Sequence, residues 1–161
     1  SLSSVYNFTK LDIFVIDFSV SFIWDVYDKW DVMKVLDKDD SVFPNTLHWQ
    51  YGHVLTVFEE ALAMGNQEVV DVDKYSKLFG TGTKPSDWGN DEVPSIESIL
   101  NDIKTLPERA THLTDKELKK EINQPIAGCK TLEELLVLNA LHISLHAGKI
   151  EEMTRVLKAE Q

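Results

Sequence analysis

Apolar side chains recur at helical spacing over most of this chain. Over residues 2–36 they form a stripe that repeats every four residues and predicts a long first helix: Phe14, Phe18, Phe22, Val26 and Trp30. The most apolar stretch of this helix, residues 11–24, is expected to lie in a core. A second helix is predicted from an N-cap at Asn45 or Thr46 to a stop at residues 65–66, with His53 in its middle. The first part of the chain is therefore predicted to be helical.

The second half shows the same periodicity, with capping signals where helices begin. A third helix is predicted to start at Ser95, and Pro107 is expected to kink or end it. Capping boxes at residues 114–117 and 131–134 predict a short helix and a last helix that continues to about Ala159. No convincing hairpin dipeptide joins two alternating runs, so a sheet-based fold has little support. We predict an all-α protein, most economically a four-helix bundle.

The connection between the second and third helices is the least regular part of the pattern. Residues 77–94 carry three of the seven glycines, two prolines and Trp88. This composition predicts a long, ordered surface loop, and such loops inside a compact domain are usually functional. The length of 161 residues suits one domain over residues 1–161.

Charge narrows the classes of partner. The chain has 16 Lys and Arg residues against 27 Asp and Glu residues, a net charge of -11, which argues against nucleic acid and anionic membrane surfaces as partners. The most apolar stretch is too short and too interrupted to span a membrane. A single cysteine, Cys129, and the lack of a recognisable signal segment lead us to expect a cytoplasmic protein.

Three histidines are the candidate chemistry of the chain. His142 and His146 stand four apart on the inward face of the last helix, so their imidazoles project about 6 Å apart along its axis, and His53 can meet them from the second helix. A buried pair satisfied by carbonyls or carboxylates is an equally weighted alternative. Three histidines converging in a bundle favour a metal site with an open position, with zinc the first choice and nickel the second.

Other polar or aromatic residues near these histidines have two interpretations each. Trp49 is either a wall of the metal pocket or plain core; Glu60 is either a catalytic base or a solvated carboxylate. Asn139 lies on the histidine face of the last helix and is a candidate for orienting a ligand or substrate. Three further residues with potential ligand or nucleophile side chains are expected to lie outside the site: His48, His112 and Cys129.

These residues resemble the motifs of the DinB-like family of four-helix bacterial proteins, which includes the YfiT-like metal proteins. His48-Trp49-Gln50-Tyr51-Gly52-His53 looks like the family's Trp-His-x-x-Gly-His helix with Trp and His exchanged. The loop at residues 78–85 is similar to the connection before helix three. Residues 142–150 look like the family's His-x-x-x-His-x-Gly-Gln-Ile motif, with Lys149 where the family commonly has Gln.

The resemblance implies a fold, ligands and a class of reaction. It implies an up-down-down-up bundle with a long crossover loop, a frequent homodimer, and metal ligands at His53, His142 and His146. It also implies a thiol S-transferase, in which the metal activates a small-molecule thiol such as bacillithiol or mycothiol against an electrophile, which we expect beneath residues 77–94. A metal-dependent hydrolase with Glu60 as base, or a non-enzymatic stress protein that binds a metal or small ligand, remains the alternative.

Overall fold

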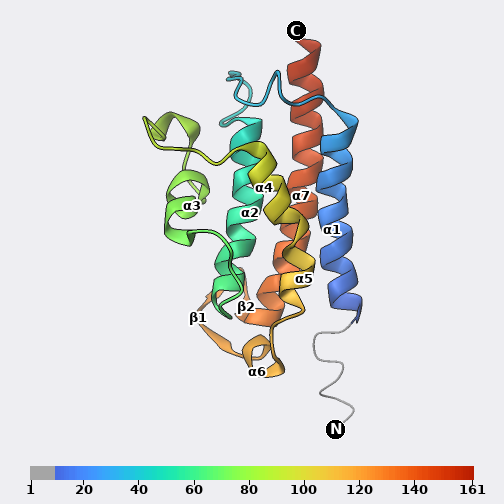
Figure 1. The fold of residues 1–161 in the computed structure, drawn as a ribbon, viewed down its shortest axis with the longest axis vertical. Helices are drawn as coiled ribbons and strands as arrows, with labels where there is room; N and C mark the ends of the chain where they lie inside the picture. Colours follow the sequence, from blue (N-terminus) through green and yellow to red (C-terminus); the bar gives the residue numbers. More distant parts are fainter. Residues whose placement is uncertain (1–9) are drawn as a thin grey trace.

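The protein is mostly helical in the computed structural model, which describes residues 10–161 (Figure 1). The helices are α1 Lys10–Lys29, α2 Leu47–Ala63, α3 Val72–Phe79, the 3-10 helix η2 Pro85–Asp87, α4 Ile96–Lys104, α5 Leu106–Ala110, α6 Asp115–Leu118 and α7 Leu132–Ala159. The prediction of a helical protein is confirmed.

The long helices lie side by side and enclose the core. In Figure 1, α1 and α7 run up the page, whereas α2 and the consecutive helices α4 and α5 run down it. α1 packs along α7, and α2 packs against both α7 and α4. The space between them is filled by fully buried side chains of α1, α2, α4 and α7, among them Ile16, Phe58, Ile99, Leu136 and Ile150.

α1 ends earlier than predicted and turns a different face to the core. The predicted residues 2–9 lie outside the described part of the chain, and the helix ends at Lys29. The predicted burial of the phenylalanine stripe is wrong, because Phe14, Phe18 and Phe22 are 58%, 51% and 41% exposed. The rings instead contact one another along the surface: Phe14 stacks on Phe18, and Phe18 meets Phe22 edge to face. The buried face is aliphatic, spaced three or four residues apart: Ile16, Val20, Ile23 and Val26.

The predicted helix starts are confirmed by their hydrogen bonds. The hydroxyl of Thr46 caps α2 by accepting from the backbone N–H of Trp49, and Ser95 caps α4 in the same way. The capping box at Thr114 is complete in α6. Thr131 caps α7, which runs to Ala159. Of the two outcomes predicted at Pro107, the helix end is the one observed: α4 stops at Lys104, and Pro107 lies in the first turn of α5, where its missing N–H costs nothing.

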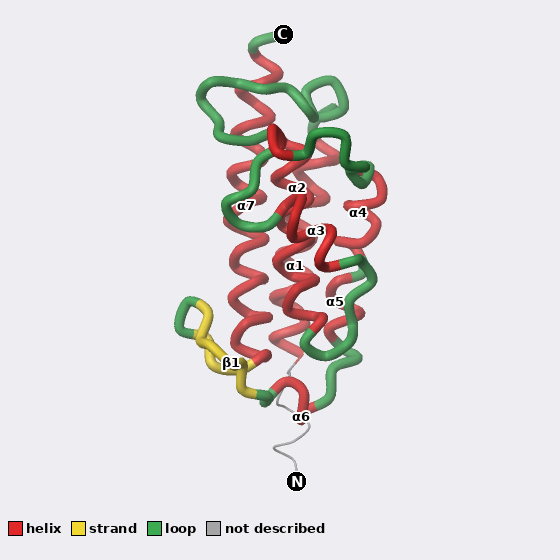
Figure 2. Tube along the Cα trace, turned by 90° about the vertical axis from the view of Figure 1, so that its left-hand side faces the viewer, coloured by secondary structure: helices red, strands yellow, loops and turns green. Residues whose placement is uncertain are grey.

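A small β-hairpin departs from the helical prediction. β1 Glu121–Ile126 pairs antiparallel with β2 Cys129–Thr131, and Figure 2 shows it at the end of the molecule where α7 begins. Both turn residues have positive φ, +50° at Ala127 and +86° at Gly128. Two successive positive φ values give the hairpin turn that matches strand twist. Ala127 is not a usual residue there, which is why the sequence did not predict this hairpin.

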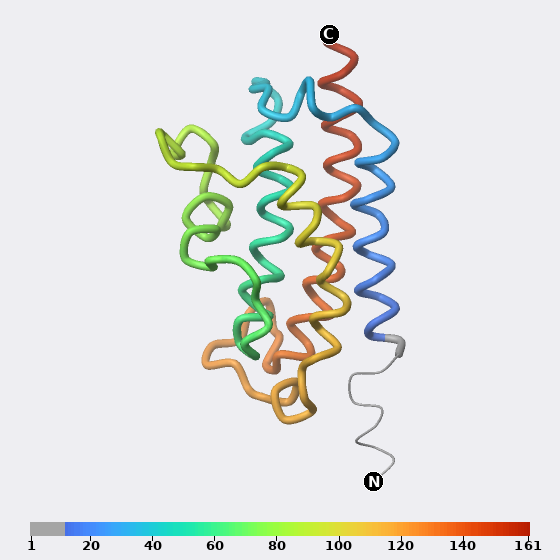
Figure 3. The backbone as a smooth tube through the Cα atoms, viewed as in Figure 1, coloured from blue at the N-terminus to red at the C-terminus, as the bar shows by residue number. Residues whose placement is uncertain are grey.

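The crossover from α2 to α4 is ordered and packs on the outer side of α2, as the tube in Figure 3 shows. Helix α3 takes the first three residues of the predicted loop. The indole N–H of Trp88 donates to the carbonyl of Leu78 at 2.8 Å, and the Thr83 hydroxyl donates to the carbonyl of Gly80 at 2.7 Å. Among residues 10–161, no helix combines the length and apolar character needed to cross a membrane.

A buried ion pair between Arg109 and Glu59 joins α5 to α2. Arg109 is 7% exposed and Glu59 is fully buried, and the guanidinium donates to the carboxylate. Arg109 also donates to the backbone carbonyl of Gln67 at 3.0 Å, and Glu59 accepts from the backbone N–H of Val69 at 3.0 Å. These bonds hold the start of the crossover against α2, because each buried charge is paired and hydrogen-bonded.

Candidate metal centre

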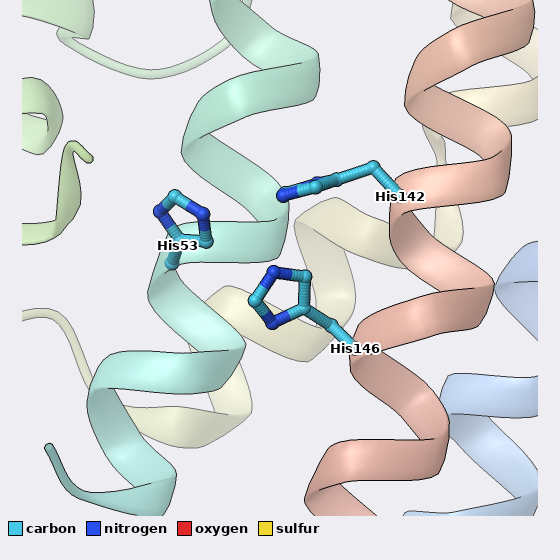
Figure 4. Close-up of side chains that lie close together, drawn as sticks. All are labelled: His53, His142 and His146. Carbon is cyan, nitrogen blue, oxygen red and sulfur yellow. The ribbon is translucent and has the colours of Figure 1, made fainter. Parts of the chain in front are cut away.

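Two long helices bring the three predicted histidines together. His53 lies in the middle of α2, and His142 and His146 lie one turn apart on α7. Figure 4 shows the three rings gathered in the space between these helices. Their nearest ligand atoms all lie within 4.8 Å of one another. We call His53, His142 and His146 the histidine triad.

Ring-to-ring distances show that the histidine triad is compact. The centroid of the His53 ring lies 5.1 Å from that of His142 and 5.0 Å from that of His146. The two rings on α7 are 4.3 Å apart. The three imidazoles therefore lie close enough together to share an ion, as the sequence predicted.

Hydrogen bonds set which nitrogen of two of these rings is free. Nδ1 of His53 lies 2.8 Å from the backbone carbonyl of Phe79, and Nδ1 of His146 lies 2.6 Å from Oε1 of Gln50. Both partners are acceptors, so Nδ1 carries the proton in each ring and Nε2 keeps its lone pair. Histidines that ligate metals nearly always donate their other N–H in this way. His53 and His146 therefore present Nε2 to the centre of the triad.

Burial keeps the histidine triad uncharged near neutral pH. Desolvation lowers the pKa of His53 below its ordinary value. Desolvation, with a contribution from His53, lowers the pKa of His142 to about 4, and desolvation with the other two histidines lowers that of His146 to about 3. Neutral imidazoles are the form that binds metals, so protons do not compete for these nitrogens at pH 7.

Trp49 lies against the site and also belongs to the hydrophobic core, so both of its interpretations stay open. Its indole stacks on the His53 ring with centroids 4.6 Å apart and planes 10° apart. The indole N–H donates to the hydroxyl of Thr83 at 3.0 Å, which fixes Trp49 from the crossover segment. Through Trp49 and the Phe79 carbonyl, the crossover holds the orientation of His53.

Glu60 and Asn139 lie near the site with other partners. The carboxylate of Glu60 accepts a hydrogen bond from the Ser76 hydroxyl at 2.7 Å, so α3 holds it. Its negative charge opposes the lowering of the His53 pKa without being the largest influence. Asn139 is 4% exposed and its amide donates to the Val57 carbonyl at 3.3 Å. The roles suggested for Glu60 and Asn139 stay predictions.

The residues expected outside the site are indeed elsewhere. His48 is buried, with Nδ1 2.9 Å from a carboxylate oxygen of Asp37 and Nε2 2.7 Å from the Pro94 carbonyl, so it ties two loops together. His112 is exposed, and Cys129 is half-buried in β2. Among the described residues, none of these belongs to the cluster that can hold a metal.

Gln50 and Gly52 contribute to the site and were not predicted. Gln50 is fully buried, and its amide N–H donates to Oδ1 of Asn45 at 2.8 Å while its oxygen accepts from His146. A Cβ at Gly52 would lie 2.3 Å from the Phe79 ring, so only glycine lets Phe79 approach α2 and place its carbonyl on His53. A glycine in mid-helix, one residue before a candidate ligand, was the available signal.

The donor set fits a divalent transition metal. Nitrogen ligands of tetrahedral zinc lie at ~2.0–2.1 Å from the ion and so ~3.3 Å from each other. Ligand atoms already within 4.8 Å need only small ring rotations to reach that spacing. Imidazole suits zinc, nickel, copper and iron alike. Three protein ligands leave at least one coordination position for another molecule.

Comparison with known proteins adds no relative. No model of a known protein family matches the chain, and no curated protein matches it.

Proposed function

We propose that the histidine triad binds a divalent metal, zinc or nickel, and that the protein is a metal-dependent thiol S-transferase. The convergence of three neutral imidazoles within 4.8 Å carries this proposal. We further propose a four-helix bundle of up-down-down-up topology and membership of the DinB-like family, on the order and spacing of the motifs. The homodimer and the cytoplasmic location stay predictions.

The open coordination position favours chemistry over a structural role. Structural zinc sites usually close around the ion with four protein ligands, whereas three ligands and an exchangeable position are typical of catalytic sites. The metal-binding group among the described residues consists of His53, His142 and His146, with no carboxylate or thiolate as a fourth member. An incoming thiol has a place to bind.

The protein's own residues prepare that position. The Phe79 carbonyl and the Gln50 amide oxygen hold the Nδ1 protons of His53 and His146, so both Nε2 atoms would be available to a bound ion. Trp49 covers one face of His53 and keeps water from it. A bound divalent ion would supply Lewis acidity that lowers the pKa of a thiol, so that its sulfur is a thiolate near neutral pH.

The proposed reaction is a substitution at carbon. The thiol gives up its proton to solvent, its sulfur forms a bond to an electrophilic carbon, and the leaving group departs with the electron pair of the broken bond. The residues around the triad need to bind and orient two small molecules and need not form a covalent bond themselves.

A reconstitution experiment tests the proposal. Protein stripped with a chelator is reloaded with zinc or nickel and incubated with an aryl chloride whose thioether product absorbs light, using a panel of bacillithiol, mycothiol, coenzyme A, glutathione and cysteine. We expect a rate with at least one thiol that requires the metal. His142→Ala, treated identically, should give only the uncatalysed rate.

The contrary results separate the alternatives. Stoichiometric metal without any rate above the metal-free sample, across all the thiols, would contradict the transferase and favour a metal- or ligand-binding protein. Equal rates in wild type and His142→Ala would show that the triad is not the site of the reaction.

A further inference from the structure

A hollow of about 540 Å³ lies beside the histidine triad, between α7, the middle of α2 and the turn of the hairpin. Much of its lining is aliphatic: Val57, Ile126, Leu138, Leu141 and Leu145. Ile126, Leu141 and Leu145 are 46%, 59% and 73% exposed. Exposed apolar side chains gathered around one hollow, unlike single ones scattered over a surface, mark a binding site.

The polar side chains that line the hollow are few. They belong to Asn139, whose amide already donates to the Val57 carbonyl, and to His142. No acidic or lysine or arginine side chain lines it, although the chain as a whole has a net charge of -11. An ionised group placed among these aliphatic side chains would lose water without gaining a charged side chain as partner. The lining therefore favours an uncharged, apolar ligand.

His142 belongs both to the histidine triad and to this lining. A molecule in the hollow thus has one end at the metal-binding residues. The volume lies within the range of ~300–1,000 Å³ that is usual for small-molecule sites. Another hollow of about 440 Å³, beneath the hairpin, is lined by charged residues such as Lys120 and Glu121 and by no histidine. The hollow at His142 is the one that adjoins the chemistry.

We propose that this hollow binds the apolar body of an uncharged electrophile, with its reactive carbon at the His142 end. The inference rests on the proposed function and names the class of its second substrate: neutral aryl or alkyl compounds in preference to ionised ones. The thiol sulfur bonds to that carbon, the thiol proton passes to solvent, and the leaving group takes the electron pair. This position of the electrophile differs from the one expected from the sequence, which was beneath residues 77–94. None of those residues lines this hollow.

Equilibrium binding tests the proposal without relying on turnover. Isothermal titration calorimetry is run on wild-type protein, with and without zinc, using 2-naphthalenemethanol and naphthalene-2-sulfonate, which share a ring system and differ in charge. In the zinc-free protein we expect the neutral probe to bind at least about tenfold more tightly, because the sulfonate must lose water where no charged side chain lines the hollow.

Two matched variants locate the binding. Leu145→Lys places an ammonium in the hollow at an exposed position that folding tolerates, and should weaken the neutral probe by about tenfold while strengthening the sulfonate. Phe18→Lys changes another exposed apolar residue, on α1, that does not line the hollow, and should leave both affinities unchanged.

Other outcomes overturn the proposal. Equal affinities for the two probes, or unchanged binding of the neutral probe in Leu145→Lys, would contradict it. A third contrary outcome is that the wild type is a dimer that does not bind the neutral probe, and that Leu145→Lys is a monomer in sedimentation. A second copy of the chain, and not a small molecule, would then cover the hollow.

The proposal and the proposed function fail separately. Selective binding of the neutral probe without any thiol transfer supports the hollow and counts against the transferase. Metal-dependent transfer that is equally fast with neutral and anionic electrophiles supports the transferase and overturns the hollow.

Discussion

Replacing Gln50 tests how the site orients one of its ligands. The Gln50 amide oxygen lies 2.6 Å from Nδ1 of His146, and Gln50 is fully buried. Gln50→Leu keeps much of the side-chain volume and removes the acceptor. The His146 ring then has no fixed proton position, so its Nε2 is no longer reserved for the metal.

The expected loss follows from the role of such partners. Removing a hydrogen-bond partner of a metal-ligating histidine typically lowers metal affinity by about 10- to 100-fold, which corresponds to about 1.4–2.7 kcal/mol. Gln50→Glu keeps an acceptor and adds a negative charge near the ion, so it should bind metal at least as tightly as wild type. Gln50→Leu should therefore lower the zinc affinity, whereas Gln50→Glu should not.

A competition titration with a chromogenic zinc chelator at constant pH measures these affinities. Thr154→Val is the control, because its buried hydroxyl donates to the Ile150 carbonyl at 2.7 Å on α7, two turns beyond His146. It removes a buried hydrogen bond and should leave zinc affinity unchanged. A zinc affinity of Gln50→Leu within about twofold of wild type would refute the positioning role of Gln50.

Three further changes should follow from packing and charge. Gly52→Ala should lower the free energy of unfolding in urea by about 1–3 kcal/mol, because the new Cβ meets the Phe79 ring at 2.3 Å. Gly148→Ala, with no atom within 4 Å of its Cβ, should raise it by about 0.5–1 kcal/mol. A change of the same sign in both variants would contradict the packing at Gly52. Arg109→Met should cost about 3–5 kcal/mol in the same assay, because it leaves the buried Glu59 carboxylate unpaired, and a loss below 1 kcal/mol would refute that. The metal-free protein should lose stability as pH falls from about 6.5 toward 4, because burial lowers the folded-state pKa values of the histidine triad and the unfolded chain takes up protons first. Thermal unfolding from pH 7.5 to 4.5 measures this, and a triple alanine variant of the triad that shows the same pH slope would contradict it.

The histidine triad was predictable because two simple rules combine at it. Spacing of four on a long, well-capped helix places His142 and His146 on one face, and α2 carries His53 to the same level. Helix starts were predictable for a related reason. Side-chain caps such as Thr46 and Ser95 act within one turn, so the sequence contains the whole interaction.

Features that depend on distant contacts were not predictable. The phenylalanine stripe of α1 is as periodic as its aliphatic face, and only packing against α7 decides which one is buried. The contact of Gln50 with His146 spans 96 residues. The hairpin turn requires a positive φ at Ala127, which the sequence of an alanine does not announce.

Metal content with X-ray absorption, on protein purified without chelator or nickel resin, tests the central claim most directly. The account predicts about one divalent ion per chain, bound by three imidazole nitrogens and by one or more ligands that exchange with the solution. His146→Ala should lose this ion while its circular dichroism keeps most of the helicity, because apolar packing holds the helices together. An ion retained in full by His146→Ala, or a wild-type spectrum with fewer than two imidazoles, would contradict it.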